Sequence, residues 1–432
     1  MSTRSEDISK WLFAVCAVAL PLLLWIVHHD RGHAGDQRFF FDWFHAVRDS
    51  ASFYATGPGV NYPIGGVAVV ALPSMWAEVL RGEALTFDTY RAVLKGTLVC
   101  AEIGLGFALA RAASALGICR SRGFAVATLL LPGMWAAGAW FGQIDVVGTV
   151  LLLGSFASLA RFAFGQARSW DLSLGLLAMH AAILMKQLAL FSISGLLVLV
   201  VLGIRRCVDR RSALILVGLS PLVWFVADPW LDLPEGYSSH LAFVLLGGGS
   251  AHGEILSGGG ANVWSLLSMN PGASAHDWRW LGISAFHWGW LLFGTVVVFF
   301  LHALLARLRA GTVRGFDVAR FIGATNLAMA VCLTGVHERY MAHGIPFLLL
   351  GVTSRSRRVQ VLSWTVAVWS GMYILASLSF DAWNGVLSPL RSHVTLAVLQ
   401  IALLATLIVD AVLDLRRVRE LLAPPSQPTL AP

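Results

Sequence analysis

The sequence predicts an all-α, polytopic integral membrane protein, and its composition supports this most directly. Of its 432 residues, 57% are hydrophobic and only 13% are charged, whereas about a quarter of an average soluble domain is charged. The mean hydropathy is +0.72. The 17 Trp and 42 Gly residues fit the same class, because aromatic side chains gather at membrane interfaces and glycine is common in membrane spans. The composition excludes a disordered chain, a coiled coil and an ordinary soluble enzyme.

The net charge of +7 is explained by arginine clusters between apolar runs. In a soluble protein this charge would suggest a nucleic-acid partner, but here it matches the positive cytoplasmic loops of membrane proteins, so no nucleic acid is expected. The clusters lie at 120–122, 205–211, 307–314, 355–358 and 416–419. Lysine is rare, which suggests GC-rich codon usage. We therefore expect a bacterial protein in the cytoplasmic (inner) membrane.

The first apolar run, 11–27, is predicted to be an uncleaved span, because no small-residue cleavage site follows it. Further runs of roughly span length lie at 93–116, 124–141, 146–164, 172–185, 188–204, 212–227, 281–305, 317–335, 341–353, 359–379 and 394–413. Together they predict about 12 membrane helices, within a range of about 11–13, with both chain ends in the cytoplasm.

The run 64–80 needs a different placement. It is long enough to span, but a crossing there would put every later arginine cluster on the outer side. We therefore expect a re-entrant or interface-lying helix on the outer face, with Pro73 in its middle. It belongs to a first external loop, 28–91, that carries interfacial helices.

A second long external loop is predicted at 228–280. It is rich in glycine, which suggests a mobile segment over a binding site. Residues 1–423 are expected to form a single membrane domain. The end of the chain, 424–432 (PPSQPTLAP), is expected to be a disordered tail.

Ionisable groups beside hydrocarbon are functional candidates by default, since leaving water is unfavourable for them. Asp36 opens the aromatic segment GDQRFFFDWF, which would hold a carboxylate at the membrane surface. The alternative is an ordinary helix N-cap. Asn61 and Tyr62 open the 64–80 run, either as site residues or as a turn with an aromatic anchor.

Two further candidates interrupt apolar sequence. Gln143 and Asp145, in WFGQID, cannot lie in lipid without partners, although a polar hairpin tip is an alternative. Lys186 separates two apolar runs. It is either a phosphate-binding group or a lysine that snorkels to the membrane surface.

The segment HERY joins two apolar runs on the face with few arginines. It consists of His337, Glu338, Arg339 and Tyr340. An arginine fork suits phosphate oxygens, and a charge-paired loop is the alternative.

In the second external loop, Asn262 and Trp264 could form a platform for a sugar ring or an interface anchor. Asp410 and Asp414 end the last span, where simple solvation is expected. No cysteine pattern or metal-ligand cluster is found, so neither a metal nor a cofactor is expected.

These elements, in this order, resemble the GT-C superfamily of polytopic glycosyltransferases. The resemblance is closest to bacterial mannosyltransferases related to the eukaryotic GPI-anchor second mannosyltransferase. It covers about residues 11–350, with HERY intact. The chain departs from the family pattern in three places: Ile64 replaces the second proline of N-Y-x-P-P, Phe141 replaces the tryptophan of W-G-Q-x-D, and Lys186-Gln187 lacks a proline.

The resemblance implies a sugar transfer from a polyprenyl-phosphate donor, with mannose suggested by the family name. The reaction would take place on the outer face of the cytoplasmic membrane, by a single inverting displacement. Asp36 would be the general base for the acceptor hydroxyl, and Asp145 would orient either the acceptor or Asp36. The acceptor, a glycan, a glycolipid or a small molecule, stays open.

The resemblance also implies roles for the remaining residues. The donor phosphate and sugar would be bound by Lys186, His337, Arg339, Gln143, Glu338 and Tyr340. The substrate loop would include Asn61, Tyr62, Asn262 and Trp264. Two alternatives stay open: a lipid-linked sugar flippase or other transporter, which should hold its charges near the bilayer midplane, and a non-catalytic scaffold subunit.

Overall fold

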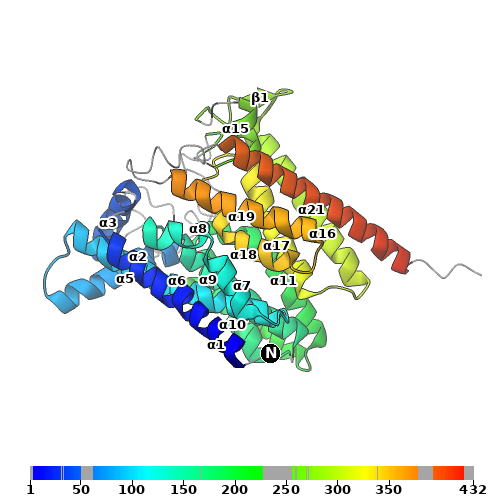
Figure 1. Cartoon of the computed structure of the whole chain (residues 1–432), viewed down its shortest axis with the longest axis horizontal. Helices are drawn as coiled ribbons and strands as arrows, with labels where there is room; N and C mark the ends of the chain where they lie inside the picture. Colours follow the sequence, from blue (N-terminus) through cyan, green and yellow to red (C-terminus); the bar gives the residue numbers. More distant parts are fainter. Residues whose placement is uncertain are drawn as a thin grey trace, which may run out of the picture.

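The computed structural model describes residues 3–30, 32, 34–49, 62–165, 167–226, 255–257, 260–268, 270, 272–337, 339–377 and 393–422. Nearly all of them are helical (Figure 1), so the predicted all-α class is confirmed. Four predictions fall outside the described residues: Asn61, Glu338, the tail 424–432, and most of the glycine-rich part of the loop 228–280.

The first half of the chain forms the following helices, with η marking 3-10 and π segments: α1 (Thr3–Ala14), η1 (Val15–Ala19), α2 (Leu20–His28), α3 (Ala34–Asp49), α5 (Ile64–Arg81), α6 (Phe87–Ala115), α7 (Ser121–Leu129), α8 (Pro132–Trp135), η2 (Ala136–Trp140), α9 (Asp145–Phe164), α10 (Ser169–Met185), η3 (Gln187–Ala189), α11 (Leu190–Arg206), α12 (Arg210–Leu219), η4 (Ser220–Leu222) and α13 (Val223–Val226).

The second half forms α15 (Val263–Ser268), β1 (Arg279–Trp280), β2 (Ile283–Ser284), α16 (Ala285–Arg309), α17 (Gly315–Cys332), η5 (Tyr340–His343), α18 (Ile345–Val352), α19 (Arg357–Ser377) and α21 (His393–Leu422). The two strands are an antiparallel hairpin in which Trp280 faces Ile283. The hairpin lies at the N-terminal end of α16 (Figure 1).

Among the described residues, eight helices are long and apolar enough to cross a membrane. This confirms a multi-pass helical membrane protein. The eight include α5. The re-entrant or interface-lying placement that the sequence predicts for 64–80 stays a prediction. The other predicted runs are also helical, but they are shorter, interrupted or less apolar than a full span. Eight of the helices in the described ranges thus have the length and hydropathy of a span, which is fewer than the 12 predicted.

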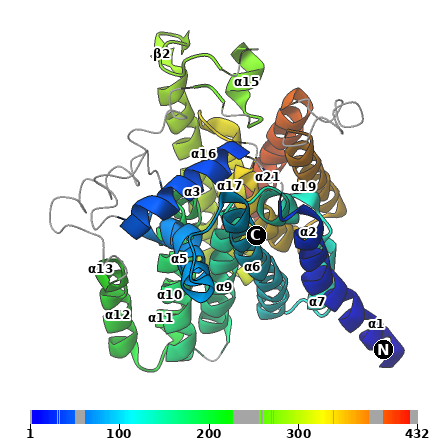
Figure 2. The same cartoon turned by 90° about the vertical axis from the view of Figure 1, so that its left-hand side faces the viewer.

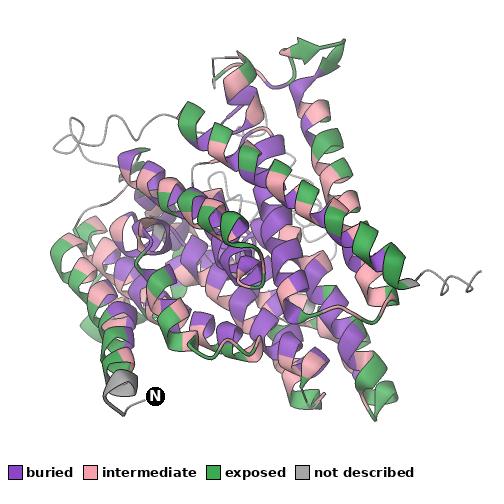
Figure 3. Cartoon of the chain, turned by 45° about the vertical axis from the view of Figure 1, so that its right-hand side comes forward, coloured by how far each residue is buried: buried purple, intermediate pink, exposed green. Residues whose placement is uncertain are grey.

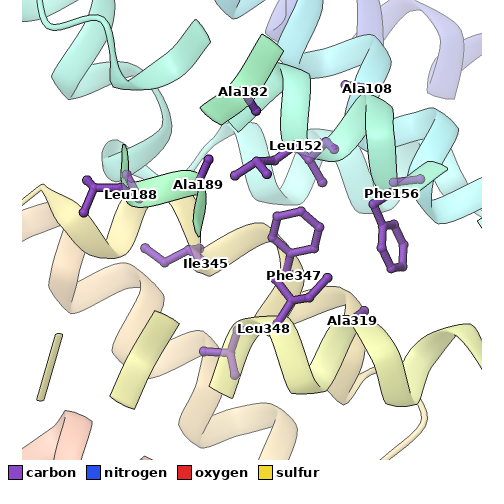
Figure 4. Packing of buried hydrophobic residues seen from close by; sticks show 14 of the residues in the cluster. Ala108, Leu152, Phe156, Ala182, Leu188, Ala189, Ala319, Ile345, Phe347 and Leu348 are labelled. Atoms are coloured by element: carbon purple, nitrogen blue, oxygen red, sulfur yellow. The ribbon is translucent and has the colours of Figure 1, made fainter. Parts of the chain in front are cut away.

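The core is built around α9, which packs against α6, α10 and α11, and around α17, which packs against α18. Phe156 of α9 meets Phe347 of α18 edge to face at 5.6 Å (Figure 4). Glycine permits close helix approach, because a Cβ at Gly323 would lie 2.5 Å from the Leu348 nitrogen. Close packing of this kind replaces the hydrophobic driving force that is missing inside a membrane.

The outer helices α1, α16 and α21 expose much of their surface (Figure 3). Their exposed residues include Trp11, Val298 and Val409, which are 73%, 65% and 59% exposed. Apolar side chains in such positions are stable only where hydrocarbon surrounds them. We therefore expect these faces to contact lipid.

The expectation that Asp410 and Asp414 are simply solvated is wrong. Both belong to a buried ion network made by Arg307, Arg320, Arg355, Asp317, Asp410 and Asp414. Arg320 of α17 donates to Asp410 at 2.7 Å and to Asp414 at 2.9 Å. Three arginines balance three carboxylates, which is what allows these groups to leave water. The network joins α16, α17 and α21.

Helix α3 has the amphipathic character that its sequence predicts. Phe40, Trp43 and Phe44 are buried against the protein, whereas Phe39 is 58% exposed. Figure 2 shows α3 lying across the bundle, at a steep angle to α10 and α11. Its location on the outer face of the cytoplasmic membrane stays a prediction.

Candidate active site

The structure brings together motifs that lie far apart in the sequence, at the ends of three helices. Asp145 is the first residue of α9, Lys186 caps the C-terminus of α10, and Arg339 follows the end of α17. Asp36 comes from the first turn of α3. Asp145 thus begins a core helix, whereas Arg339 is the N-cap of η5, beyond the end of α17.

Asp145 is the centre of the site and is 1% exposed. Its Oδ1 accepts a hydrogen bond from Lys186 Nζ at 2.7 Å and lies 3.3 Å from His343 Nε2. Its Oδ2 lies 3.7 Å from Arg339 Nε. A buried carboxylate is stable only with such partners, so the hairpin-tip interpretation of this motif does not hold.

Lys186 points into the protein and is 2% exposed, so it does not snorkel. Its ammonium group lies 5.1 Å from the Tyr62 ring centroid and 5.3 Å from that of Tyr340. Two aromatic faces and one carboxylate thus surround the cation. Burial raises the pKa of Tyr340 to about 12, so this phenol stays neutral at physiological pH.

Asp36 is the accessible carboxylate of the site, with its side chain 30% exposed. Gln143 Nε2 donates a hydrogen bond to Asp36 Oδ2, and Arg339 Nη2 lies 3.8 Å from the same oxygen. Because α3 begins at Ala34, Asp36 is inside the helix and is not its N-cap. The helix N-terminus favours a negative charge at this position.

The turn that presents Gln143 requires glycine. Gly142 has φ +81°, a conformation that other residues adopt only with strain. A Cβ at Gly142 would also lie 2.5 Å from Gln37 Nε2. Gln37, which follows Asp36, donates to the Phe141 carbonyl at 2.9 Å. The turn and the start of α3 are therefore bound to each other.

The sequence analysis missed two residues of this site. His343 is 1% exposed, and its Nδ1 lies 3.0 Å from Thr149 Oγ1. Thr149 stands one helical turn after Asp145, and His343 one turn after Tyr340. Helical spacing from each motif was the only signal for them, because both lie within apolar runs.

Other predicted residues lie at the edge of the network or outside it. The His337 ring is 5.1 Å from that of Tyr340. Asn262 is fully buried, and its Nδ2 donates to the carbonyls of Leu256 and Leu333 at 2.8 and 3.0 Å. Trp264 Nε1 donates to the Cys332 carbonyl at 2.5 Å. These two side chains hold their loop against the end of α17, and their contact with substrate stays a prediction.

Across the described ranges, no group of three His, Cys, Asp or Glu side chains lies close enough to hold a metal ion. The positive charges of the site are supplied by Lys186 and Arg339 themselves. The residues that meet are thus two carboxylates, two cations, two tyrosines, a glutamine and a histidine.

The structure is similar to two crystal structures of ArnT from Cupriavidus metallidurans. One is bound to undecaprenyl phosphate; it has 17% sequence identity and a TM-score of 0.46, with 95% of this chain and 78% of the ArnT chain covered. The other is the apo state, with 18% identity and a TM-score of 0.47, covering 96% of this chain and 74% of that chain. No protein-family model and no curated protein matches the sequence.

Proposed function

We propose that this chain is an integral membrane glycosyltransferase of the GT-C type. It would move a sugar, with mannose as the first candidate, from a polyprenyl-phosphate donor to an acceptor hydroxyl on the outer face of the bacterial cytoplasmic membrane. One observation carries the proposal: a partly exposed carboxylate, Asp36, shares one buried network with the cations Lys186 and Arg339.

The two carboxylates have environments that suit different roles. Asp145 is buried and surrounded by three cationic or donor groups, so it is a weak base. The side chain of Asp36 is 30% exposed, against 1% for that of Asp145. Asp36 would therefore take the proton from the acceptor hydroxyl as general base, while Asp145 holds Lys186 and Arg339 in place.

The cations suit a phosphate leaving group. Displacement at the anomeric carbon leaves a negatively charged lipid phosphate, which needs charge stabilisation more than it needs a proton. Arg339 is 3.8 and 3.7 Å from its two carboxylates, which is longer than a strong charged hydrogen bond. On phosphate binding, its guanidinium group would exchange these longer carboxylate contacts for closer contacts with the phosphate oxygens. Lys186, held by Asp145, would add to the positive electrostatic potential at the leaving phosphate.

The location of the charges favours an enzyme over a transporter. A carrier is expected to bind its substrate near the bilayer midplane, often at broken helices. Here the charged residues lie at the start of α9, at the end of α10 and beyond the end of α17. In the proposed enzyme these helix ends would lie toward a membrane face, where a donor headgroup and a polar acceptor can meet.

The test is a transfer assay on purified protein with polyprenyl-phosphate-mannose. Release of polyprenyl phosphate is followed with and without a membrane lipid extract as acceptor source. We expect acceptor-dependent release that is lost in Asp36→Asn. Asp42→Asn is the matched control, because Asp42 lies on the same helix and its carboxylate pairs with the exposed Arg38. Release from no member of a panel of polyprenyl-phospho-sugars would refute the proposal.

A further inference from the structure

Three charged residues lie along one side of helix α6. They are Arg91, Lys95 and Glu102, called here the α6 stripe. Positions i, i+4 and i+11 fall within about 40° of one another on a helix with 3.6 residues per turn. Lys95 is fully buried and Glu102 is 2% exposed. Buried charges within a span are unfavourable and need a reason to be there.

Glu102 and Lys95 bind the backbone of the segment that precedes Gln143. Arg91 binds Gln37, whose side chain contacts the same segment. Glu102 Oε1 accepts a hydrogen bond from the Ala139 amide at 2.7 Å. Lys95 Nζ donates to the Trp140 carbonyl at 2.9 Å. Arg91 Nε donates to Gln37 Oε1 at 2.8 Å, and Gln37 in turn binds the Phe141 carbonyl.

The geometry of that segment explains why it needs these partners. Residues 136–140 form a π-helix, η2, which departs from the ordinary α-helical hydrogen-bond pattern. Lys95 Nζ also donates to the His28 carbonyl at 2.5 Å, at the end of α2. One ammonium group thus satisfies the last carbonyls of two helices. Gly138 leaves room for this arrangement, since a Cβ there would overlap Glu102 Oε1.

We infer that the α6 stripe positions Gln143 against Asp36. The stripe fixes three successive residues, 139–141, and the next turn presents Gln143. Through Gln37 it also fixes the first turn of α3, which carries Asp36. Both halves of the Gln143–Asp36 hydrogen bond are therefore held by the same helix.

The inference rests on the proposed function for its meaning, because a positioned base implies a proton to remove. It differs from a purely structural role in what it predicts. A structural role requires only that backbone groups have partners. A positioning role requires that loss of the stripe changes turnover through Gln143, while donor binding by Lys186 and Arg339, which lie on other elements, changes little.

The variants are Glu102→Leu, which removes the acceptor for the Ala139 amide, and Glu102→Gln, which keeps it. Thr97→Val is the matched control, because Thr97 lies on α6 and donates only within its own helix, to Val93. Donor kcat and KM are measured in the transfer assay on the full chain in nanodiscs, with thermal unfolding recorded for each variant.

We expect Glu102→Leu to lower kcat about 10- to 100-fold with the donor KM within about threefold of wild type. Glu102→Gln should restore most of the loss, and Thr97→Val should have no effect. Adding Glu102→Leu to Gln143→Ala should lower kcat no further than Gln143→Ala alone, since both act on one contact. Wild-type kcat in folded Glu102→Leu, or losses that multiply in the double variant, would overturn the inference.

Amide hydrogen exchange provides a second readout that needs no substrate. Glu102→Leu should speed exchange both at 136–143 and at 34–40, because Gln37 and Gln143 link the two segments. Faster exchange at 136–143 alone would reduce the stripe to local support and overturn the inference. If Glu102→Leu does not fold, Lys95→Met is measured in its place. If the wild type transfers no sugar, the proposed function fails, and the exchange pattern still decides the inference.

Discussion

Asp36 and a donor phosphate should compete for Arg339. The guanidinium Nη2 lies 3.8 Å from Asp36 Oδ2, so a phosphate must draw Arg339 away from this carboxylate. Removing the Asp36 charge in Asp36→Asn should therefore tighten the binding of a polyprenyl phosphate, even though it stops transfer.

The magnitude follows from the geometry. Two unit charges at this separation attract by about 1 kcal/mol in a water-like dielectric and by about 4 kcal/mol at an effective dielectric of about 20. The Asp36 side chain is 30% exposed, which places the pair near the lower value, in the range of surface ion pairs. We expect a gain of about 1 kcal/mol, or about fivefold in Kd.

The assay is the binding of undecaprenyl phosphate to the protein in nanodiscs, measured for a double-mutant cycle. Arg339→Ala alone should weaken binding by about tenfold or more. In the Arg339→Ala background, Asp36→Asn should bring little gain, because the competing pair is already gone. Asp42→Asn controls for a general change of charge on α3.

Two results would refute this reasoning. If Asp36→Asn tightens binding equally with and without Arg339, the effect is general electrostatic repulsion of the phosphate by the carboxylate. If Asp36→Asn weakens binding, Asp36 helps to hold the lipid rather than competing with it.

Three further predictions concern stability and geometry. Lys186→Ala should lower the free energy of unfolding by about 3–5 kcal/mol, because it leaves Asp145 buried without its closest cation; chemical unfolding in detergent measures this, and Lys186→Arg should recover part of it. Gly142→Ala should cost about 1–2 kcal/mol from its positive φ and reduce transfer further through its overlap with Gln37; normal turnover would contradict the role of the turn. Arg320→Ala should cost about 3–5 kcal/mol at the other end of the bundle, with the polyprenyl-phosphate Kd of the folded fraction unchanged; altered affinity would show coupling between the two networks.

The sequence predicted the helices well, because a span is encoded locally by a run of apolar residues. It also predicted the members of the site where a polar residue interrupts such a run, as for Asp145 and Lys186. It did not predict their pairing. The 2.7 Å bond between these two residues joins the start of one core helix to the end of the next, and helix packing, which one sequence does not reveal, decides it.

The residues that were missed share a different property. Lys95 and Glu102 lie inside a long helix that is apolar on average, so a window of hydropathy hides them. Their partners are backbone atoms of an irregular segment, 139–141, which no local pattern announces. Arg320 was not predicted for a related reason: the two carboxylates that accept its hydrogen bonds are about 90 residues away in the chain. Hydropathy thus locates spans, whereas the charges inside them show where the backbone or another helix needs a partner.

The two buried charge systems also differ in kind, and this difference is the strongest reason to place the chemistry at Asp36. In the network of Arg320 and Asp414 each carboxylate faces arginines, and the side chain of Asp414 is 6% exposed. The most exposed of these carboxylates, Asp410, is 21% exposed and pairs with Arg320 and Arg355. At the other end of the bundle, the side chain of Asp145 is 1% exposed, whereas that of Asp36 is 30% exposed. A general base must lie within hydrogen-bond reach of the proton that it takes from its substrate. Of these carboxylates, Asp36 meets that condition best, and the rest of the site holds it there.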